Sequence, residues 1–220
     1  MTNSVIAGRP PSLPPQLRRP MATVAVLATL VLALLGILYS ADSGPGAFDR
    51  WAQPAFDDVE APLSYVALLI DFGGEPLGAA LLVAAILAGC LVLRRRRLAV
   101  LSVAGPGLTV AATTVLKPVV GRTIHGSHFA FPSGHTALAT ALALVLALLA
   151  VNLLRSGRLP GVLLVLVAAS AAGTAMAWAQ VTLGAHYPTD TLGGLCTALA
   201  VVPATAWLID RIADRRADTG

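Results

Sequence analysis

Long apolar runs separated by short polar stretches form the dominant pattern of this chain. An apolar helix of about 20 residues is long enough to cross the hydrocarbon core of a bilayer. Six segments of about this length are predicted to span a membrane, at residues 21–40, 76–93, 98–116, 132–154, 160–179 and 188–209. Another apolar stretch, 62–70, is too short to span and predicts an interfacial or half-buried helix. The sequence therefore predicts an all-α, polytopic membrane protein with six transmembrane helices.

The polar ends of the chain predict two tails around this membrane domain. Residues 1–20 contain five prolines and three arginines but no acid, which is typical of a flexible basic tail. The six-helix domain is expected at 21–210, and a second tail at 211–220. Both tails are predicted to be cytoplasmic from the charge pattern described below.

Composition supports a membrane protein and excludes a soluble domain. Hydrophobic residues make up 56% of the chain and charged residues 12%, whereas soluble proteins have about 25% charged residues. The net charge of +4 does not indicate nucleic-acid binding, because the charges are sorted between polar segments and form no single patch. We therefore expect membrane lipids as surroundings and no nucleic-acid partner.

The basic residues give the orientation in the membrane. With six spans, twelve of the fifteen lysines and arginines fall on one side: Arg9, Arg18, Arg19, Arg94, Arg95, Arg96, Arg97, Arg155, Arg158, Arg211, Arg215 and Arg216. The other side has only Arg50, Lys117 and Arg122. Because short cytoplasmic segments are enriched in Lys and Arg, the arginine-rich side and both termini are predicted to be cytoplasmic.

The segment Phe131-Pro-Ser-Gly-His135 opens one of the predicted helices on the opposite side. Pro132 suits a first helical position, and the amides that follow it have no intrahelical acceptor. Such amides, with the helix dipole behind them, favour an anion such as phosphate. Ser133 adds a hydroxyl, Gly134 allows close approach, and His135 adds a titratable group. The alternative is a helix cap with an incidental surface histidine.

A second polar segment, His186-Tyr-Pro-Thr-Asp190, opens the last predicted helix. Asp190 falls in its first turn, from which the carboxylate can reach back to the His186 imidazole. A carboxylate on one ring nitrogen fixes the tautomer and leaves the other nitrogen as a nucleophile or base. The alternative is an aspartate that only caps the helix.

The other ionisable residues on this side are predicted to favour an anion over a metal. All four histidines and the single lysine, Lys117, lie in or beside two neighbouring outer segments. Ionisable groups at the ends of membrane spans indicate function. The histidines do not have the spacing of a zinc site. Zinc-binding helices place two histidines four residues apart, whereas the only close pair here, His125 and His128, is three residues apart. Lys117 and Arg122 repel a cation, so no metal and no cofactor is predicted.

These motifs, in this order, resemble the signatures of the type 2 phosphatidic acid phosphatase (PAP2) superfamily over about residues 62–210. The resemblance implies a PAP2-like bundle and a metal-independent phosphoesterase with a phosphohistidine intermediate. His186 would be the nucleophile, Asp190 its orienting carboxylate, and His135 the proton donor. Lys117, Arg122, Ser133 and Gly134 would bind the phosphoryl oxygens.

Two positions depart from the family pattern, and both remove a guanidinium group. Where the family has Arg-Pro after its lysine, this chain has Ile124 and His125. Where the family has Ser-Arg before its nucleophile, this chain has Ala179 and Gln180. Gln180 can donate hydrogen bonds without charge, and a protonated His125 would add a cation. We therefore expect an altered phosphate pocket with these two residues as further candidates.

The predicted function is an integral membrane phosphatase that hydrolyses a lipid phosphate or diphosphate at the outer leaflet. Polyprenyl and phosphatidate-type lipids both suit an apolar site at the membrane surface. Two alternatives remain at this stage. One is a lipid phosphotransferase, in which another alcohol replaces water. The other is a non-catalytic lipid-phosphate binder or transporter, which the missing arginines favour and the set His135, His186 and Asp190 opposes.

Overall fold

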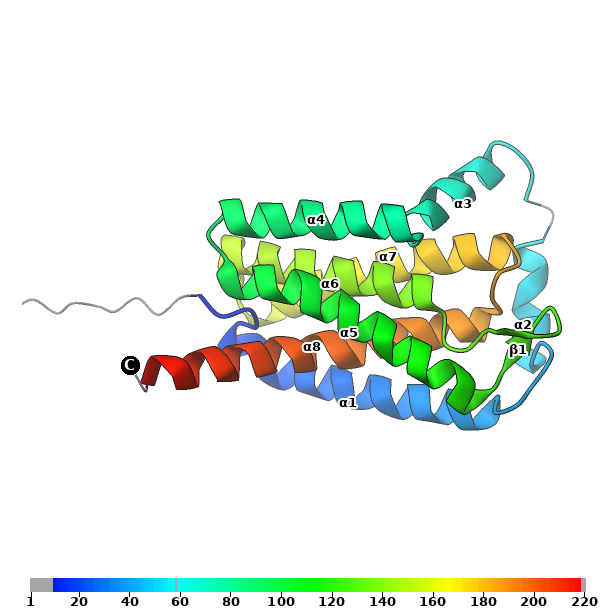
Figure 1. The fold of residues 1–220 in the computed structure, drawn as a ribbon, viewed down its shortest axis with the longest axis horizontal. Coiled ribbons are helices and arrows are strands. Elements are labelled where there is room, and N and C mark those ends of the chain that lie inside the picture. Colours follow the sequence, from blue (N-terminus) through cyan, green and yellow to red (C-terminus); the bar gives the residue numbers. More distant parts are fainter. Residues whose placement is uncertain (1–9, 58, 219–220) are drawn as a thin grey trace, which may run out of the picture.

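The computed structural model describes residues 10–57 and 59–218, and most of this chain is helical (Figure 1). In chain order the helices are α1 (Pro15–Leu38), α2 (Ala47–Ala52), the 3₁₀ turn η1 (Gln53–Ala55), α3 (Leu63–Phe72), α4 (Pro76–Val92), α5 (Arg96–Val120), α6 (Gly134–Leu154), α7 (Arg158–Thr182) and α8 (Pro188–Asp218). A two-stranded antiparallel hairpin, β1 (Thr123–Ile124) and β2 (His128–Phe129), lies between α5 and α6. The all-α membrane fold is confirmed.

Five of these helices are long and apolar enough to cross a membrane individually, and α3 with α4 forms the sixth candidate span. The 17 residues of α4 extend about 26 Å, slightly less than the roughly 30 Å hydrocarbon core. The axis of α3 is bent by 65° from that of α4. The predicted short helix at 62–70 is present as α3, which forms the short arm of this bent pair. We call the segment from Asp71 to Glu75, where the two arms meet, the elbow.

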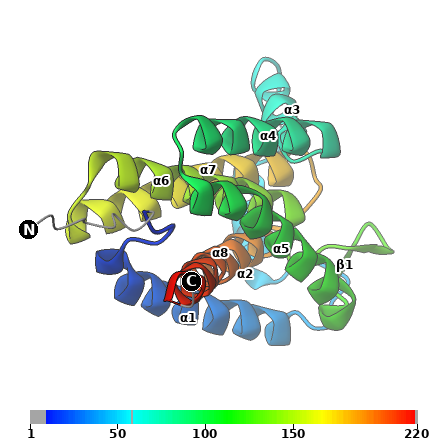
Figure 2. The same ribbon diagram turned by 60° about the vertical axis from the view of Figure 1, so that its left-hand side comes forward.

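The central helix of the bundle is α6, which contacts α4, α5, α7 and α8. Its buried residues lie all around its circumference, as expected for a helix enclosed by others. By contrast, α1 buries only Leu17, Met21 and Ala28 and packs at the side against α8 and α7 (Figure 2). Large apolar side chains on the outer faces of α1 and α4 are exposed, which suits contact with lipid.

The first turns of α6 and α8 touch because α8 has two consecutive glycines there. A Cβ at Gly194 would lie 2.3 Å from the Ser133 carbonyl oxygen, and one at Gly193 would lie 2.5 Å from the Phe131 ring. At this close approach the Ser133 amide donates to the Asp190 carbonyl, with N···O 2.9 Å. The two sequence motifs that begin these helices are thereby fixed side by side.

The bundle has two chemically different ends. At one, which we call the arginine end, α1 begins, α8 ends, and the turns at 93–95 and 155–157 join neighbouring helices (Figure 1). The opposite end, which we call the site end, contains α2, the elbow, the hairpin and the starts of α6 and α8. The predicted polar loop at 118–131 is partly ordered, because α5 continues to Val120 and the hairpin follows.

The predicted tails differ from the structure. Helix α1 begins at Pro15, so residues 15–20 of the expected flexible tail are helical. Helix α8 likewise continues through most of the expected C-terminal tail, to Asp218. The arginines in these segments mark the edge of the apolar core, but arginine is a good helix former and does not end a helix. Residues 1–9 and 219–220 lie outside the described residues.

A buried carboxylate ties the N-terminal segment to the last helix. Asp210 accepts hydrogen bonds from the Ser12 amide at 2.8 Å, the Ser12 hydroxyl at 3.0 Å and the Leu13 amide at 2.9 Å. Arg97 on α5 approaches the same carboxylate at 3.3 Å and pairs with the exposed Asp214 at 2.7 Å. Residues 12 and 13 are therefore part of the folded bundle. We call this set of contacts the Asp210 clasp.

Replacing Asp210 with alanine is expected to destabilise the protein by about 2–4 kcal/mol, because buried donors lose their acceptor. Thermal unfolding in detergent should show a clearly lower Tm, and limited proteolysis should cleave faster near residue 12. Asp214→Ala is the matched control, since it removes an exposed partner of the same arginine and should cost less than about 1 kcal/mol. Equal Tm values for the two variants would contradict a stabilising role for the clasp.

Candidate active site

The segment 131–135 begins α6, two residues later than predicted. Ser133 is the N-cap, and its Oγ accepts from the Thr136 amide at 3.4 Å. Pro132 therefore precedes the cap and does not occupy the first helical position. The Ser133 amide is used by Asp190, so the amides left at the start of the helix are those of Gly134 and His135. Neither has a hydrogen-bond acceptor among the described residues, as expected for the first turn of a helix.

His186 and Asp190 lie together at the start of α8, as the sequence predicts. The distance from His186 Nδ1 to Asp190 Oδ2 is 3.7 Å, within ion-pair range and slightly longer than a hydrogen bond. The His186 side chain is only 8% exposed, and Nδ1 has no other hydrogen-bond partner among the described residues. Asp190 Oδ2 also accepts from the Tyr187 amide at 2.9 Å. The carboxylate is therefore fixed on the Nδ1 side of the imidazole ring.

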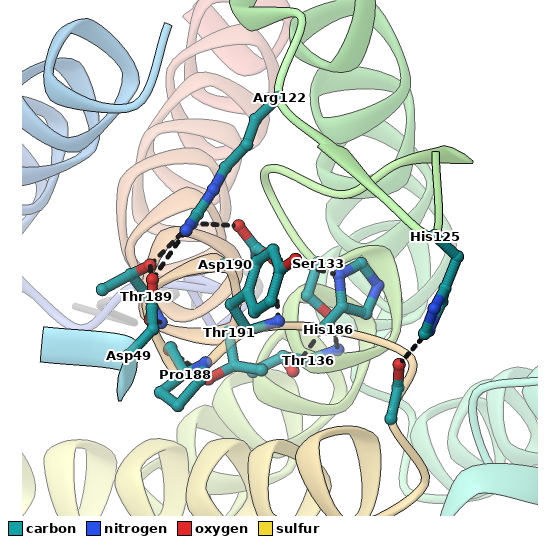
Figure 3. Close-up of polar contacts among 12 residues, drawn as sticks. Asp49, Arg122, His125, Ser133, Thr136, His186, Pro188, Thr189, Asp190 and Thr191 are labelled. Atoms are coloured by element: carbon teal, nitrogen blue, oxygen red, sulfur yellow. Dashed lines mark hydrogen bonds and ion pairs between the residues drawn. The ribbon is translucent and has the colours of Figure 1, made fainter. Parts of the chain in front are cut away.

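Arg122 binds carboxylates and is not placed as a phosphate ligand. Its side chain is fully buried, with Nη1 2.7 Å from Asp190 Oδ1 and Nη2 2.6 Å from Asp49 Oδ2 (Figure 3). Nη1 also donates to Thr189 Oγ1 at 2.6 Å. Asp49 in turn accepts from the Thr189 amide at 2.9 Å. We call Asp49, Arg122, Thr189 and Asp190 the arginine cluster, and its effect is to hold Asp190 rigidly.

Two tyrosines enclose the guanidinium group. The Arg122 Cζ atom lies 4.1 Å from the centre of the Tyr39 ring and 4.7 Å from that of Tyr187. Cation–π contacts of this kind are strongest where water is excluded. Burial raises the pKa of the Tyr187 phenol, and Arg122 opposes this effect. Tyr187 is therefore neutral at physiological pH, and its ring covers the Arg122 guanidinium group.

Lys117 and His125 approach the site from the end of α5 and from the hairpin. Lys117 is half-buried in the last turn of α5 and interacts electrostatically with Asp190. His125 is exposed, and its Nε2 lies 2.9 Å from the Gly184 carbonyl oxygen. A pocket of about 580 Å³ opens beside it. The pocket is lined by Pro45, Arg50, Gln53, Pro54, Asp57, Ile124, His125, Gly184, His186 and Tyr187.

His135 faces the elbow. Its Nε2 lies 3.8 Å from Asp71 Oδ1 and 3.6 Å from Glu75 Oε1. The Gln180 side chain donates a hydrogen bond to the same Asp71 oxygen, and the Gln180 carbonyl accepts from the His186 amide at 3.3 Å. Gln180 thus links the surroundings of the two histidines.

Asp49 and Asp71 were not among the predicted site residues. Asp49 lies in a polar segment between predicted helices, and Asp71 directly follows the short apolar stretch at 62–70. Asp49 meets Arg122 and Asp71 meets His135, each across at least 64 positions of sequence, so no local spacing indicates the contacts. The sequence gives no signal for either contact, because only the fold shows that Arg122 is buried beside Asp49.

Known proteins were compared with this chain. Residues 77–213 match the PAP2 superfamily. A similar solved structure is the crystal structure of a transmembrane PAP2-type phosphatidylglycerolphosphate phosphatase from Bacillus subtilis, with a TM-score of 0.65 and 24% sequence identity. That similarity covers 87% of this chain and 96% of the other. A search of curated proteins found no match.

The superfamily match spans more than half of the chain and includes Lys117, His135, His186 and Asp190. The chain therefore belongs to the PAP2 superfamily, and the resemblance seen in the sequence is confirmed. It is a multi-pass membrane phosphatase with the helical fold of this family. Family membership favours the predicted enzyme over the non-catalytic binder.

Proposed function

We propose that this protein hydrolyses a lipid phosphate through a phosphohistidine intermediate on His186. The observation that supports this proposal most directly is the placement of Asp190. Its carboxylate lies 3.7 Å from His186 Nδ1 and is itself held by the fully buried Arg122. A carboxylate on Nδ1 keeps the proton there, so that Nε2 carries the lone pair. A histidine oriented in this way is suited to nucleophilic attack.

The reaction then has two steps. In the first, His186 Nε2 forms a bond to phosphorus as the bond from phosphorus to the leaving oxygen breaks, and His135 gives that oxygen a proton. In the second, His135 takes a proton from water, whose oxygen attacks phosphorus and breaks the N–P bond. Inorganic phosphate and free His186 result. Asp190 stabilises the positive charge on the His186 ring throughout.

The phosphoryl oxygens are expected to lie against the start of α6. The amides of Gly134 and His135 are the donors there, and Lys117 adds a positive charge from α5. Such fixed donors stabilise the charge that develops in the transition state. The Ser133 hydroxyl, which donates to Thr136 Oγ1 at 3.2 Å, would turn toward the phosphate when it is bound. Arg122 belongs to the support of Asp190, so the ligand set is smaller than the sequence predicted.

A lipid substrate is supported by what surrounds this site. An apolar groove of about 490 Å³ lies between α1 and α5 and is lined in part by Leu116, Val120 and Phe131. Phe131 directly precedes the proposed phosphate-binding segment, so a hydrocarbon chain in the groove would approach it from the membrane. The arginine end and the site end lie at opposite ends of the bundle, and the positive-inside rule therefore supports a site at the outer leaflet. Both termini are then cytoplasmic.

The test is phosphate release by the purified protein in detergent, with a panel of phosphatidate, phosphatidylglycerolphosphate and polyprenyl mono- and diphosphates. We expect turnover of at least one lipid, and we expect the rate to be unchanged by EDTA because the positive charge of Lys117 beside Asp190 disfavours a cation there. Loss of activity in EDTA, restored by a divalent metal, would contradict the metal-free mechanism. Transfer of phosphate to an added alcohol instead of water would favour the phosphotransferase alternative.

A further inference from the structure

The elbow between α3 and α4 places two carboxylates against His135. Asp71 lies in the last turn of α3, and Glu75 directly precedes α4. Between them, Gly74 packs on the imidazole so closely that a Cβ there would lie 2.1 Å from His135 Cδ2. The elbow is therefore in direct contact with the proposed proton donor, and the bend in the broken span is what brings the carboxylates there.

Nε2 of His135 is the ring atom that meets these carboxylates. It is buried and has no hydrogen-bond partner among the described residues, and its nearest acids are Glu75 at 3.6 Å and Asp71 at 3.8 Å. An ionised carboxylate only accepts hydrogen bonds. A nitrogen that faces two of them is favourable only as a donor, so Nε2 keeps its proton and Nδ1 is left for proton exchange.

Asp71 is the better fixed of the two acids. Its side chain is 20% exposed and accepts the hydrogen bond from Gln180, whereas the Glu75 side chain is 53% exposed and makes no hydrogen bond among the described residues. Gln180 stands where the family pattern has an arginine. A neutral amide holds Asp71 in place without neutralising its charge, whereas an arginine would form an ion pair with it.

We propose that Asp71 is a positioning residue for His135, held by Gln180, and that it fixes Nδ1 as the atom that gives and takes the proton. The proposal rests on the proposed function, in which His135 protonates the leaving oxygen. The two histidines are then arranged oppositely: a carboxylate faces Nδ1 of His186 and leaves Nε2 for phosphorus, while Asp71 faces Nε2 of His135 and leaves Nδ1 for the proton.

The role of Asp71 in proton transfer can be separated from a purely structural role by comparing two substrates, one whose leaving group needs a proton and one whose leaving group does not. Asp71→Asn keeps the size of the side chain and an oxygen for Gln180, but removes the charge. We expect kcat for a lipid phosphate, whose alkoxide needs a proton, to fall about 10–100-fold, within the range of general acid catalysis. The first-turnover burst of p-nitrophenol from p-nitrophenyl phosphate needs no proton on the leaving group and precedes the step in which His135 activates water, so its rate should fall less than about threefold. Asp42→Asn, which removes an exposed acid at the same end, is the control.

Two further variants test the assignment to His135. Gln180→Ala should reproduce the selective loss in weaker form, because Asp71 is no longer held. In a His135→Gln background, Asp71→Asn should cause no additional loss. Equal losses for both substrates, or a full additional loss in the His135→Gln background, would overturn the proposal.

The tautomer of His135 can be measured directly, without an activity assay. With ¹⁵N-labelled histidine, NMR spectra of the detergent-solubilised protein should show the neutral His135 ring protonated at Nε2, and Asp71→Asn should reduce that preference. His135→Gln identifies the signal among the four histidines. A ring protonated at Nδ1 overturns the inference. If the wild-type protein cleaves no lipid in the panel, that result contradicts the proposed function but leaves the assignment of the His135 tautomer intact.

Discussion

Replacing His186 with alanine is expected to lower phosphate release by about 10⁴-fold or more, because it removes the proposed nucleophile, the histidine whose Nδ1 faces Asp190. Loss of the nucleophile in enzymes that use covalent catalysis has effects of this order. The measurement is phosphate release from whichever lipid the wild type cleaves. With ³²P-labelled substrate and an alkaline quench, which preserves phosphohistidine, the wild type should incorporate label and His186→Ala should not.

His128→Ala is the matched control for this experiment. His128 is an exposed histidine on β2 of the neighbouring hairpin and is not among the residues that line the pocket beside His125 and His186. Its replacement should leave both turnover and labelling close to the wild-type values. Label that persists in His186→Ala would mean that a different residue, or no residue, carries the phosphoryl group.

Replacing Arg122 with methionine is expected to destabilise the protein strongly, by about 3–5 kcal/mol. Asp49 and Asp190 would keep their burial but lose the charge that compensates both, and a buried charge left alone is costly. The Tm in detergent should fall by roughly 10 °C. Turnover should fall as well, since Asp190 would no longer be held next to His186.

Arg158→Met provides the comparison, because it removes an exposed arginine at the start of α7 and should change stability by less than about 0.5 kcal/mol. A second comparison is Arg122→Met combined with Asp49→Asn, which removes one of the two uncompensated charges and should recover part of the lost stability. If Arg122→Met unfolds at the wild-type temperature, the cluster does not support the site as described.

The membrane spans and the two histidine motifs could be predicted because each is a local pattern. Apolar length indicates a span, and the segments around His135 and His186 contain their own helix-starting residues. The role of Arg122 could not be predicted in the same way. In the sequence it stands near Lys117 and resembles a phosphate ligand, but only the folded chain shows that α2 brings Asp49 to it.

Helix boundaries and the elbow show a related limit. Arg18 and Arg19 mark the end of the apolar stretch, yet α1 begins at Pro15. Backbone hydrogen bonds of a helix can continue beyond the apolar stretch, so the two boundaries need not coincide. At the elbow, Gly73 and Gly74 predict a break. The 65° angle that places Asp71 on His135 depends on how α3 packs against α7, which no residue of the elbow encodes by itself.

The Asp210 clasp also constrains how the chain is assembled during synthesis. Its two halves, Ser12 and Asp210, are 198 positions apart, and chains are made from the N-terminus at about 5–20 residues per second. α1 therefore enters the membrane at least several seconds before its partner in α8 exists. The Ser12 and Leu13 amides have to remain in water or with a temporary partner throughout this interval. The clasp can close only after the Asp210 segment of α8 has been made, and it then joins α1 to α8.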